Sequence, residues 1–216
     1  MDTGLEAIGR ITGLPFVVGI KPYATFFVFG LLLRTGYVVD PFFLGARFEF
    51  FKSTAGLAIF GFLFLIDTFA DKIPVVDHIS DLIHTVLKPI AGALLGFVSV
   101  GAVQMSDLLG IISVAMAVVG GGAIALATHV TKATMRVAST KFTAGFANPA
   151  ISFGEDVLVA VGTFALVRHP AIFGVIILVF LVIFCVLAPR IFAAFRLITS
   201  KGIAFFRYWM GLDQTR

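Results

Sequence analysis

The stretch ITGLPFVVGIKPYATFFVFGLLL, residues 11–33, is apolar and long enough to cross a bilayer, yet Lys21 and Pro22 stand near its middle. A spanning helix needs about 20 mainly apolar residues. A lysine at the centre of such a helix is costly, and a proline removes a backbone hydrogen bond. Gly19 and Pro22 therefore predict a break in the first apolar helix, with Lys21 at the break.

The composition of the whole chain also indicates a membrane environment. The chain has 216 residues, of which 59% are hydrophobic and 13% charged. Soluble domains carry about 25% charged residues, so this composition predicts a polytopic membrane protein. The sequence contains no Gly-rich phosphate loop, GxSxG or HExxH motif. We therefore expect no enzyme, no cofactor and, despite the net charge of +4, no nucleic-acid partner.

Six apolar runs predict an all-α membrane bundle of about six spans. They cover residues 11–35, 54–70, 89–105, 108–128, 150–168 and 170–189. This division predicts a transmembrane domain over residues 1–189, followed by a basic, amphipathic segment over 190–216 at the membrane surface. Most Lys and Arg residues then fall on one side of the membrane, which places both termini in the cytoplasm by the positive-inside rule.

Two features concern how the spans pack and how they are joined. The GxxxG pattern of Gly92 and Gly96 favours close helix packing. The linkers 71–88 and 129–149 are polar on one side, and residues 77–88 have the pattern of a short amphipathic helix, interfacial or re-entrant. Asp77, Asp81 and His84 share one face of that helix. They could hold a divalent cation, but a solvated helix face has the same pattern.

Carboxylates stand near the predicted ends of two spans. Asp67 and Asp71 lie four residues apart, so they share a helix face, and Lys72 follows them. They are either functional groups or carboxylates that reach the membrane interface.

The stretch NPAISFGED, residues 148–156, allows two helix starts. Asn148 followed by Pro149 is a strong start signal, whereas Ser152 with Glu155 forms a capping box. Only the first start places Glu155 and Asp156 inside the membrane, and we favour it.

The basic stretch that contains Lys132, Arg136 and Lys141 has more than one interpretation. It is a cytoplasmic positive belt, or it supplies counter-charges to Glu155 and Asp156 or binds phosphate.

The break at Lys21 also has two interpretations. A discontinuous or re-entrant helix would present Lys21 and the positive end of the helix that begins at Pro22 to an anion. That anion is a substrate group or a carboxylate such as Asp67 or Glu155. Alternatively, residues 3–20 form an interfacial or re-entrant helix, the span begins at Pro22, and Lys21 lies at the interface.

Four short motifs occur in a recognisable order: GIKPY (19–23), DKIPVVD (71–77), KPIAG (88–92) and SFGED (152–156). With these motifs the chain resembles a family of bacterial integral membrane proteins known only as a domain of unknown function. The resemblance covers most of residues 15–165 and does not include 190–216. It implies a helical bundle in the bacterial inner membrane and no established activity.

These features together predict a small transporter or permease for an ion or a small anionic solute. The residues expected to bind the solute or a coupling ion are Lys21, Pro22, Asp67, Asp71, Lys72, Glu155 and Asp156. The alternatives are a translocase or scramblase for phosphorylated lipids and a membrane scaffold that transports nothing. The expected partners are membrane lipids and the small solute or ion. A homo-oligomer is a further possibility.

Overall fold

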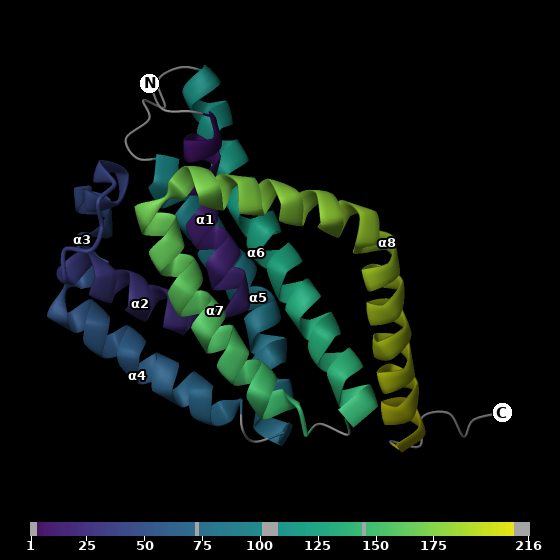
Figure 1. Ribbon diagram of the computed structural model, residues 1–216. Helices are drawn as coiled ribbons and strands as arrows, with labels where there is room; N and C mark the ends of the chain where they lie inside the picture. The colour runs from purple at the N-terminus through teal and green to yellow at the C-terminus, as the bar shows by residue number, and fades with distance from the viewer. Residues whose placement is uncertain (1–3, 72–73, 101–107, 144–145, 210–216) are drawn as a thin grey trace.

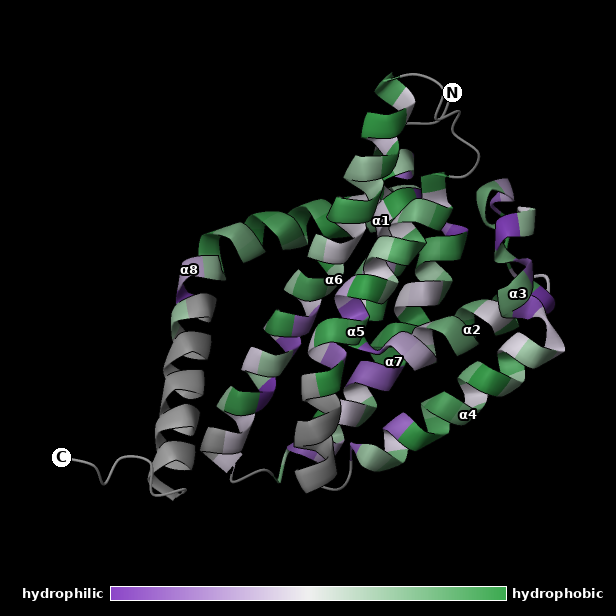
Figure 2. Ribbon diagram, turned by 180° about the vertical axis from the view of Figure 1, so that it is seen from behind, coloured by the Kyte–Doolittle hydropathy of each residue, from purple (hydrophilic) through white to green (hydrophobic). Residues whose placement is uncertain are grey.

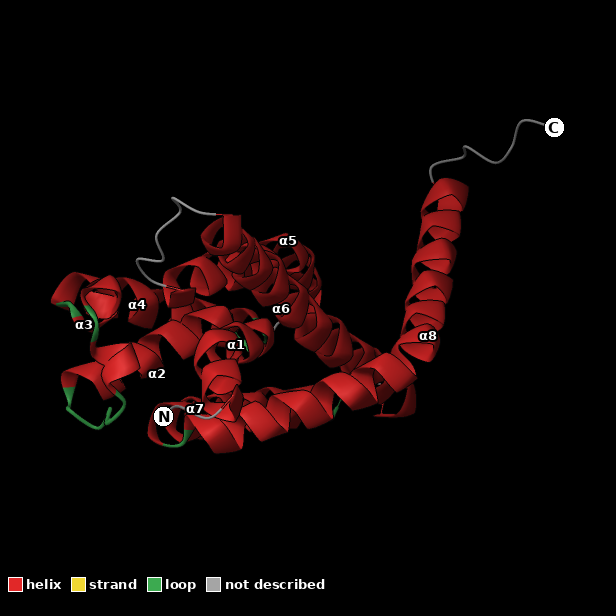
Figure 3. Ribbon diagram, turned by 90° about the horizontal axis from the view of Figure 1, so that it is seen from above, coloured by secondary structure: helices red, strands yellow, loops and turns green. Residues whose placement is uncertain are grey.

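The computed structural model describes residues 4–71, 74–100, 108–143 and 146–209, with side chains except those of residues 74–82, 141–142, 191–192 and 194–209. These residues fold entirely into helices and connecting loops, with no strand among them (Figures 1 and 3). The helices are α1 (Gly4–Ile20), α2 (Pro22–Arg34), η1 (Pro41–Leu44), η2 (Ala46–Phe48), α3 (Glu49–Lys52), α4 (Thr54–Ala70), α5 (Pro74–Val100), α6 (Leu108–Thr143), α7 (Asn148–Arg168) and α8 (Pro170–Trp209).

Within the described residues, four helical segments are long and apolar enough to cross a membrane. They are Ile83–Val100, Leu108–Thr140, Asn148–Arg168 and Pro170–Arg190. A fifth is obtained if Ala46–Lys52 and Thr54–Ala70, which meet at 58°, form one broken span. The structure is thus an all-α membrane bundle as expected, with four or five long spans where the sequence predicts six. The difference arises mainly because the first apolar run is divided between α1 and α2.

The division falls at Lys21, which lies alone between α1 and α2. Its backbone is extended, with φ of −143° and ψ of 105°, and Pro22 occupies the first turn of α2. Proline has a fixed φ and no N–H, so it can begin a helix but cannot continue one. In Figure 1, α2 leaves α1 in a different direction. The predicted break is confirmed at the predicted residue.

Helix α1 forms the centre of the bundle because it packs against α2, α5, α6, α7 and α8. Leu14, Val17 and Val18 on α1 are buried in the hydrophobic core. Figure 2 shows the complementary pattern outside, where hydrophobic residues cover much of α4 and of the first half of α8. Lipid is the natural contact of these outer faces.

Glycine allows two pairs of helices to approach closely. A Cβ atom on Gly92 of α5 would lie 2.5 Å from the carbonyl oxygen of Gly121 on α6, and one on Gly121 would collide with the carbonyl of Gly92. Gly96 meets the backbone of Ala117 in the same way. The predicted packing through Gly92 and Gly96 is therefore confirmed. Gly174 of α8 and Gly9 of α1 make a second close backbone approach.

The segment between α2 and α4 folds into a small aromatic cluster. Phe29 of α2 is fully buried and its ring contacts those of Phe43, Phe48 and Phe51 at centroid distances of 5.4–5.8 Å. Asp40 accepts a hydrogen bond from the amide of Phe42 (2.9 Å) and pairs with Arg10 of α1 (2.7 Å). This ion pair ties the aromatic segment to the central helix.

Three helices are longer than the sequence suggests. Residues 77–88 are not a separate helix, because α5 continues through Pro89 to Val100. Much of the linker 129–149 belongs to α6, which ends at Thr143. Helix α8 extends through Pro189 to Trp209 and bends in Figures 1 and 3. A proline inside a helix is a usual cause of such a bend. The segment 190–209 is therefore continuous with the last span.

Candidate functional site

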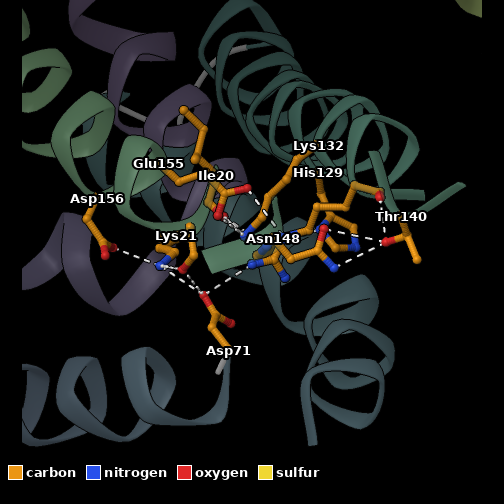
Figure 4. A network of polar contacts seen from close by, with 12 residues as sticks. Ile20, Lys21, Asp71, His129, Lys132, Thr140, Asn148, Glu155 and Asp156 are labelled. Carbon is orange, nitrogen blue, oxygen red and sulfur yellow. Dashed lines mark hydrogen bonds and ion pairs between the residues drawn. The ribbon is translucent and has the colours of Figure 1, made fainter. Parts of the chain in front are cut away.

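The side chain of Lys21 is buried at the helix break and is surrounded by polar groups from α4 and α7. It is 1% exposed. Its Nζ lies 2.9 Å from Asp71 Oδ2 and 2.8 Å from Asp156 Oδ1, and it donates a hydrogen bond to Ser152 Oγ at 3.0 Å. Ser152 in turn donates to Asp71 Oδ2 at 2.9 Å. Figure 4 shows Asp71 and Asp156 converging on the ammonium of Lys21.

The partners of Lys21 are positioned by the ends of two helices. Asp71 is the C-cap of α4, and its backbone N–H donates to the carbonyl of Asp67. Helix α7 begins at Asn148, with a proline in its first turn, so the first of the two predicted starts is correct. Ser152 and Asp156 are four residues apart on that helix and therefore face the same way.

A second group of charges lies around Glu155, the neighbour of Asp156. Lys132 Nζ is 3.0 Å from Glu155 Oε2, and Arg136 Nε is 3.6 Å from Glu155 Oε1. Arg136 also reaches Asp71, with Nη2 at 3.6 Å from Oδ2, so it joins the two groups. Lys132 and Arg136 therefore serve as counter-charges of Glu155, in agreement with the second interpretation of that basic stretch. The side chain of Lys141 lies outside the described residues.

The backbone at the break is part of the same arrangement. The carbonyl oxygen of Ile20, the last residue of α1, accepts hydrogen bonds from Lys88 Nζ (3.0 Å) and Lys132 Nζ (3.2 Å). The last carbonyls of a helix carry partial negative charge and favour cations. Lys88 is fully buried, and its Nζ is 3.0 Å from His129 Nδ1. Thr85 lies at the other ring nitrogen of His129, 3.1 Å away.

We define the ionic cluster as these linked charged residues. Its cations are Lys21, Lys88, Lys132 and Arg136, and its carboxylates are Asp71, Glu155 and Asp156. Burial of single charges is expensive, and removal of one partner from a buried pair leaves an uncompensated charge. Figure 2 shows hydrophilic residues gathered in the middle of the bundle, between the labels of α5 and α7. The cluster is thus a polar interior within an apolar set of helices.

Asp71, at the end of α4, shows how strongly the cluster acts on one group. Burial by itself would raise the pKa of its carboxyl group. Burial is the largest single influence, but Lys21, Lys132 and Arg136 together outweigh it and hold the pKa of Asp71 below its ordinary value. Asp71 is therefore a charged member of the cluster rather than a solvated carboxylate at the interface.

Asp67 has a different partner from its neighbour Asp71. It is 5% exposed, and its Oδ1 lies 3.7 Å from His84 Nε2 on α5. The ring of Tyr23 packs against the ring of His84 at 5.7 Å. The sequence suggests Asp67 or Glu155 as the partner of Lys21, whereas its contacts are Asp71 and Asp156.

A groove opens beside the ionic cluster, between α6 and α7. It has a volume of about 560 Å³ and reaches α1 at Ile20 and α8 at Phe180. Its walls are mostly apolar, and its charged residues are Lys132 and Glu155. This volume is within the range of small-molecule sites, about 300–1,000 Å³.

The predicted metal site is only partly covered by the described residues. The side chains of Asp77 and Asp81 lie outside them, as does Lys72, while His84 faces Asp67. Among the described residues no group of three or more His, Cys, Asp or Glu side chains is arranged to hold a metal ion.

Sequence reasoning missed three members of the arrangement. Lys88 shares an amphipathic pattern with Asp77 and Asp81, so it resembles part of a solvated face. His129 is isolated in the sequence, and Ser152 resembles a helix cap. One sequence signal at Lys88 could have indicated a buried role. Lys88 directly precedes Pro89, as Lys21 directly precedes Pro22 at the helix break.

An apolar helical bundle with a buried ionic cluster at a broken helix defines a membrane protein of the multi-pass class. The chain belongs to the family described as a domain of unknown function, DUF4126, which matches residues 8–190. The ionic cluster lies wholly within the matched residues, and most of the basic C-terminal segment lies beyond them. No curated protein and no solved structure matches the chain.

Proposed function

We propose that this protein is a transporter or permease of the bacterial inner membrane for an ion or a small anionic solute, with both termini in the cytoplasm. The observation that carries the proposal is the complete burial of Lys21 at a helix break. Discontinuous helices form the binding sites of many transporters. Charged residues within spans mark ion and substrate pathways by default, and the candidate spans contain five members of the ionic cluster: Lys88, Lys132, Arg136, Glu155 and Asp156.

The contacts of Lys21 suggest how an anion would be accepted. The side chain of Asp156 is 21% exposed, whereas that of Asp71 is 6% exposed. A solute anion would therefore compete with Asp156 for the ammonium, while Asp71 and Ser152 keep Lys21 in place. The displaced carboxylate of Asp156 would turn to its exposed side as the anion enters, so the charge balance around Lys21 is kept and no buried charge is left unpaired.

Transport in reconstituted vesicles tests this proposal. Proteoliposomes would be loaded with a pH indicator, and gradients of chloride, phosphate and octanoate would be imposed in turn under a potassium diffusion potential. We expect flux of at least one of these anions, and Asp156→Asn should change it at least tenfold. Lys52→Gln is the control, because Lys52 forms an exposed pair with Glu49. Equal fluxes in wild type, Asp156→Asn and protein-free vesicles would refute the proposal.

The groove supports a second candidate, a translocase or scramblase for phosphorylated lipids. Its apolar walls lie between α6 and α7, two candidate spans, where a lipid chain could approach from the side. A fluorescent phospholipid in proteoliposomes tests it, because an external reductant quenches only the outer leaflet. Quenching beyond one half of the signal, absent in empty vesicles, would favour this candidate.

A further inference from the structure

Lys132 is the cation that belongs to both the groove and the ionic cluster. It lines the groove together with Glu155, and its side chain is 9% exposed. Its Nζ has two described partners, the carboxylate of Glu155 and the carbonyl of Ile20.

Both partners of Lys132 have a second cation. Glu155 Oε1 faces Arg136 Nε, and the carbonyl of Ile20 also accepts from Lys88. If Lys132 turned away, the carbonyl of Ile20 would keep Lys88. Glu155 would keep Arg136 at 3.6 Å from Oε1, while its buried Oε2 gave up the 3.0 Å ion pair. Lys21 differs in this respect, because it is the described partner of Asp156.

From this redundancy we infer that the groove is a binding site for an anionic phospholipid, whose phosphate takes the ammonium of Lys132 and whose acyl chain lies in the groove. The apolar wall for the chain is formed by Phe16, Met135, Ile151, Leu158 and Phe180. When Lys132 turns to the phosphate, Arg136 remains near Glu155, and the lipid supplies a new anionic partner for the ammonium. A headgroup with net negative charge fits this state better than a zwitterionic one.

The inference gives the lipid-handling candidate a headgroup class and a binding residue. Movement of the bound lipid rests on that proposed function. Binding of the lipid does not, and it is tested separately.

Native mass spectrometry of the full chain in detergent provides the test. The probes are dioleoyl phosphatidylglycerol and dioleoyl phosphatidylcholine, which have the same chains and differ in net charge. We expect phosphatidylglycerol to bind wild type at least tenfold more tightly. Lys132→Gln should remove that preference, because glutamine can still donate a hydrogen bond to Glu155 or Ile20 but carries no charge. Lys52→Gln should keep the preference.

A second variant tests the place of the acyl chain. Gly154 lines the groove, and a Cβ atom there would meet nothing within 4 Å. Gly154→Leu should therefore fold, fill part of the groove and weaken binding of both lipids at least fivefold. Gly120→Leu is its matched control, because Gly120 lies outside this groove and also has open space around a Cβ atom.

Three outcomes would overturn the inference. They are equal binding of the two lipids to wild type, an unchanged lipid preference in Lys132→Gln, and displacement of phosphatidylglycerol by millimolar inorganic phosphate, which would identify a free anion as the ligand. Loss of lipid preference in Lys132→Gln without any lipid movement by wild type would instead support the site and refute the lipid-handling function.

Discussion

The ammonium of Lys21 and the carboxylate of Asp156 form a 2.8 Å ion pair although 135 residues separate them in the chain. The pair joins the break after α1 to the third turn of α7. We expect Lys21→Met to lower the free energy of unfolding by about 3–5 kcal/mol, because it leaves buried carboxylates without their main cation. Reversible unfolding in mixed detergent micelles measures this change.

Lys52→Met is the matched control for that variant. Lys52 pairs with Glu49 at a similar distance of 2.8 Å, but both side chains are exposed. Such pairs contribute about 0–1 kcal/mol. Equal losses in the two variants would show that burial of Lys21 has no energetic consequence.

Neighbouring glycines on α6 should respond oppositely to the same substitution. Gly121→Leu places a side chain against the backbone of Gly92, whereas Gly120 has nothing within 4 Å of a Cβ atom. We expect Gly121→Leu to cost about 3 kcal/mol or more, since the two helices must separate. Gly120→Leu should be neutral or stabilising, because leucine is a better helix former than glycine. Thermal unfolding in detergent compares them, and a similar melting temperature for both variants would argue against the close contact of α5 and α6.

The lowered pKa of Asp71 predicts how its contribution to stability depends on pH. A carboxyl group whose pKa is lower in the folded than in the unfolded state stabilises the fold above its ordinary pKa of about 3.9. That stabilisation is lost as the pH falls through the lower, folded value. Asp71→Asn should therefore be less stable than wild type at pH 5, and the gap should narrow toward pH 3. A gap that stays constant over this range would mean that Asp71 is not held charged by Lys21.

The pair of Arg10 and Asp40 should show measurable coupling, because it is partly buried and short at 2.7 Å. A double-mutant cycle with Arg10→Gln and Asp40→Asn should give about 0.5–3 kcal/mol. The same cycle on Lys52 and Glu49, an exposed pair three residues apart on a short helix, should give about 0.5 kcal/mol or less. The prediction fails if the exposed pair couples as strongly.

Local chemistry explains what could be predicted from the sequence. Pro22 has no N–H and Gly92 has no side chain, so the break and the close packing follow from single residues. The start of α7 follows from Asn148 and Pro149 in the same way. These are properties of a residue and its immediate neighbours.

The contacts of the site depend on where separate helices meet. Lys21 reaches Asp71 rather than Asp67 because Asp67 faces His84 on α5, which no local pattern shows. In the sequence Lys88 resembles a solvated lysine, whereas in the structure it donates a hydrogen bond to the carbonyl of Ile20 on α1. The span count differs for a related reason, since hydropathy registers the apolar run around Lys21 but not the change of direction between α1 and α2.

The order of the charges along the chain has a consequence for biosynthesis. All four cations of the ionic cluster, but only Asp71 among its carboxylates, precede residue 148. Because α7 is synthesised after them, Lys21, Lys132 and Arg136 enter the membrane before their partners Glu155 and Asp156. The addition of α7 is therefore the step that completes the ionic cluster, and a chain that ended before α7 would hold four of its cations and one of its carboxylates.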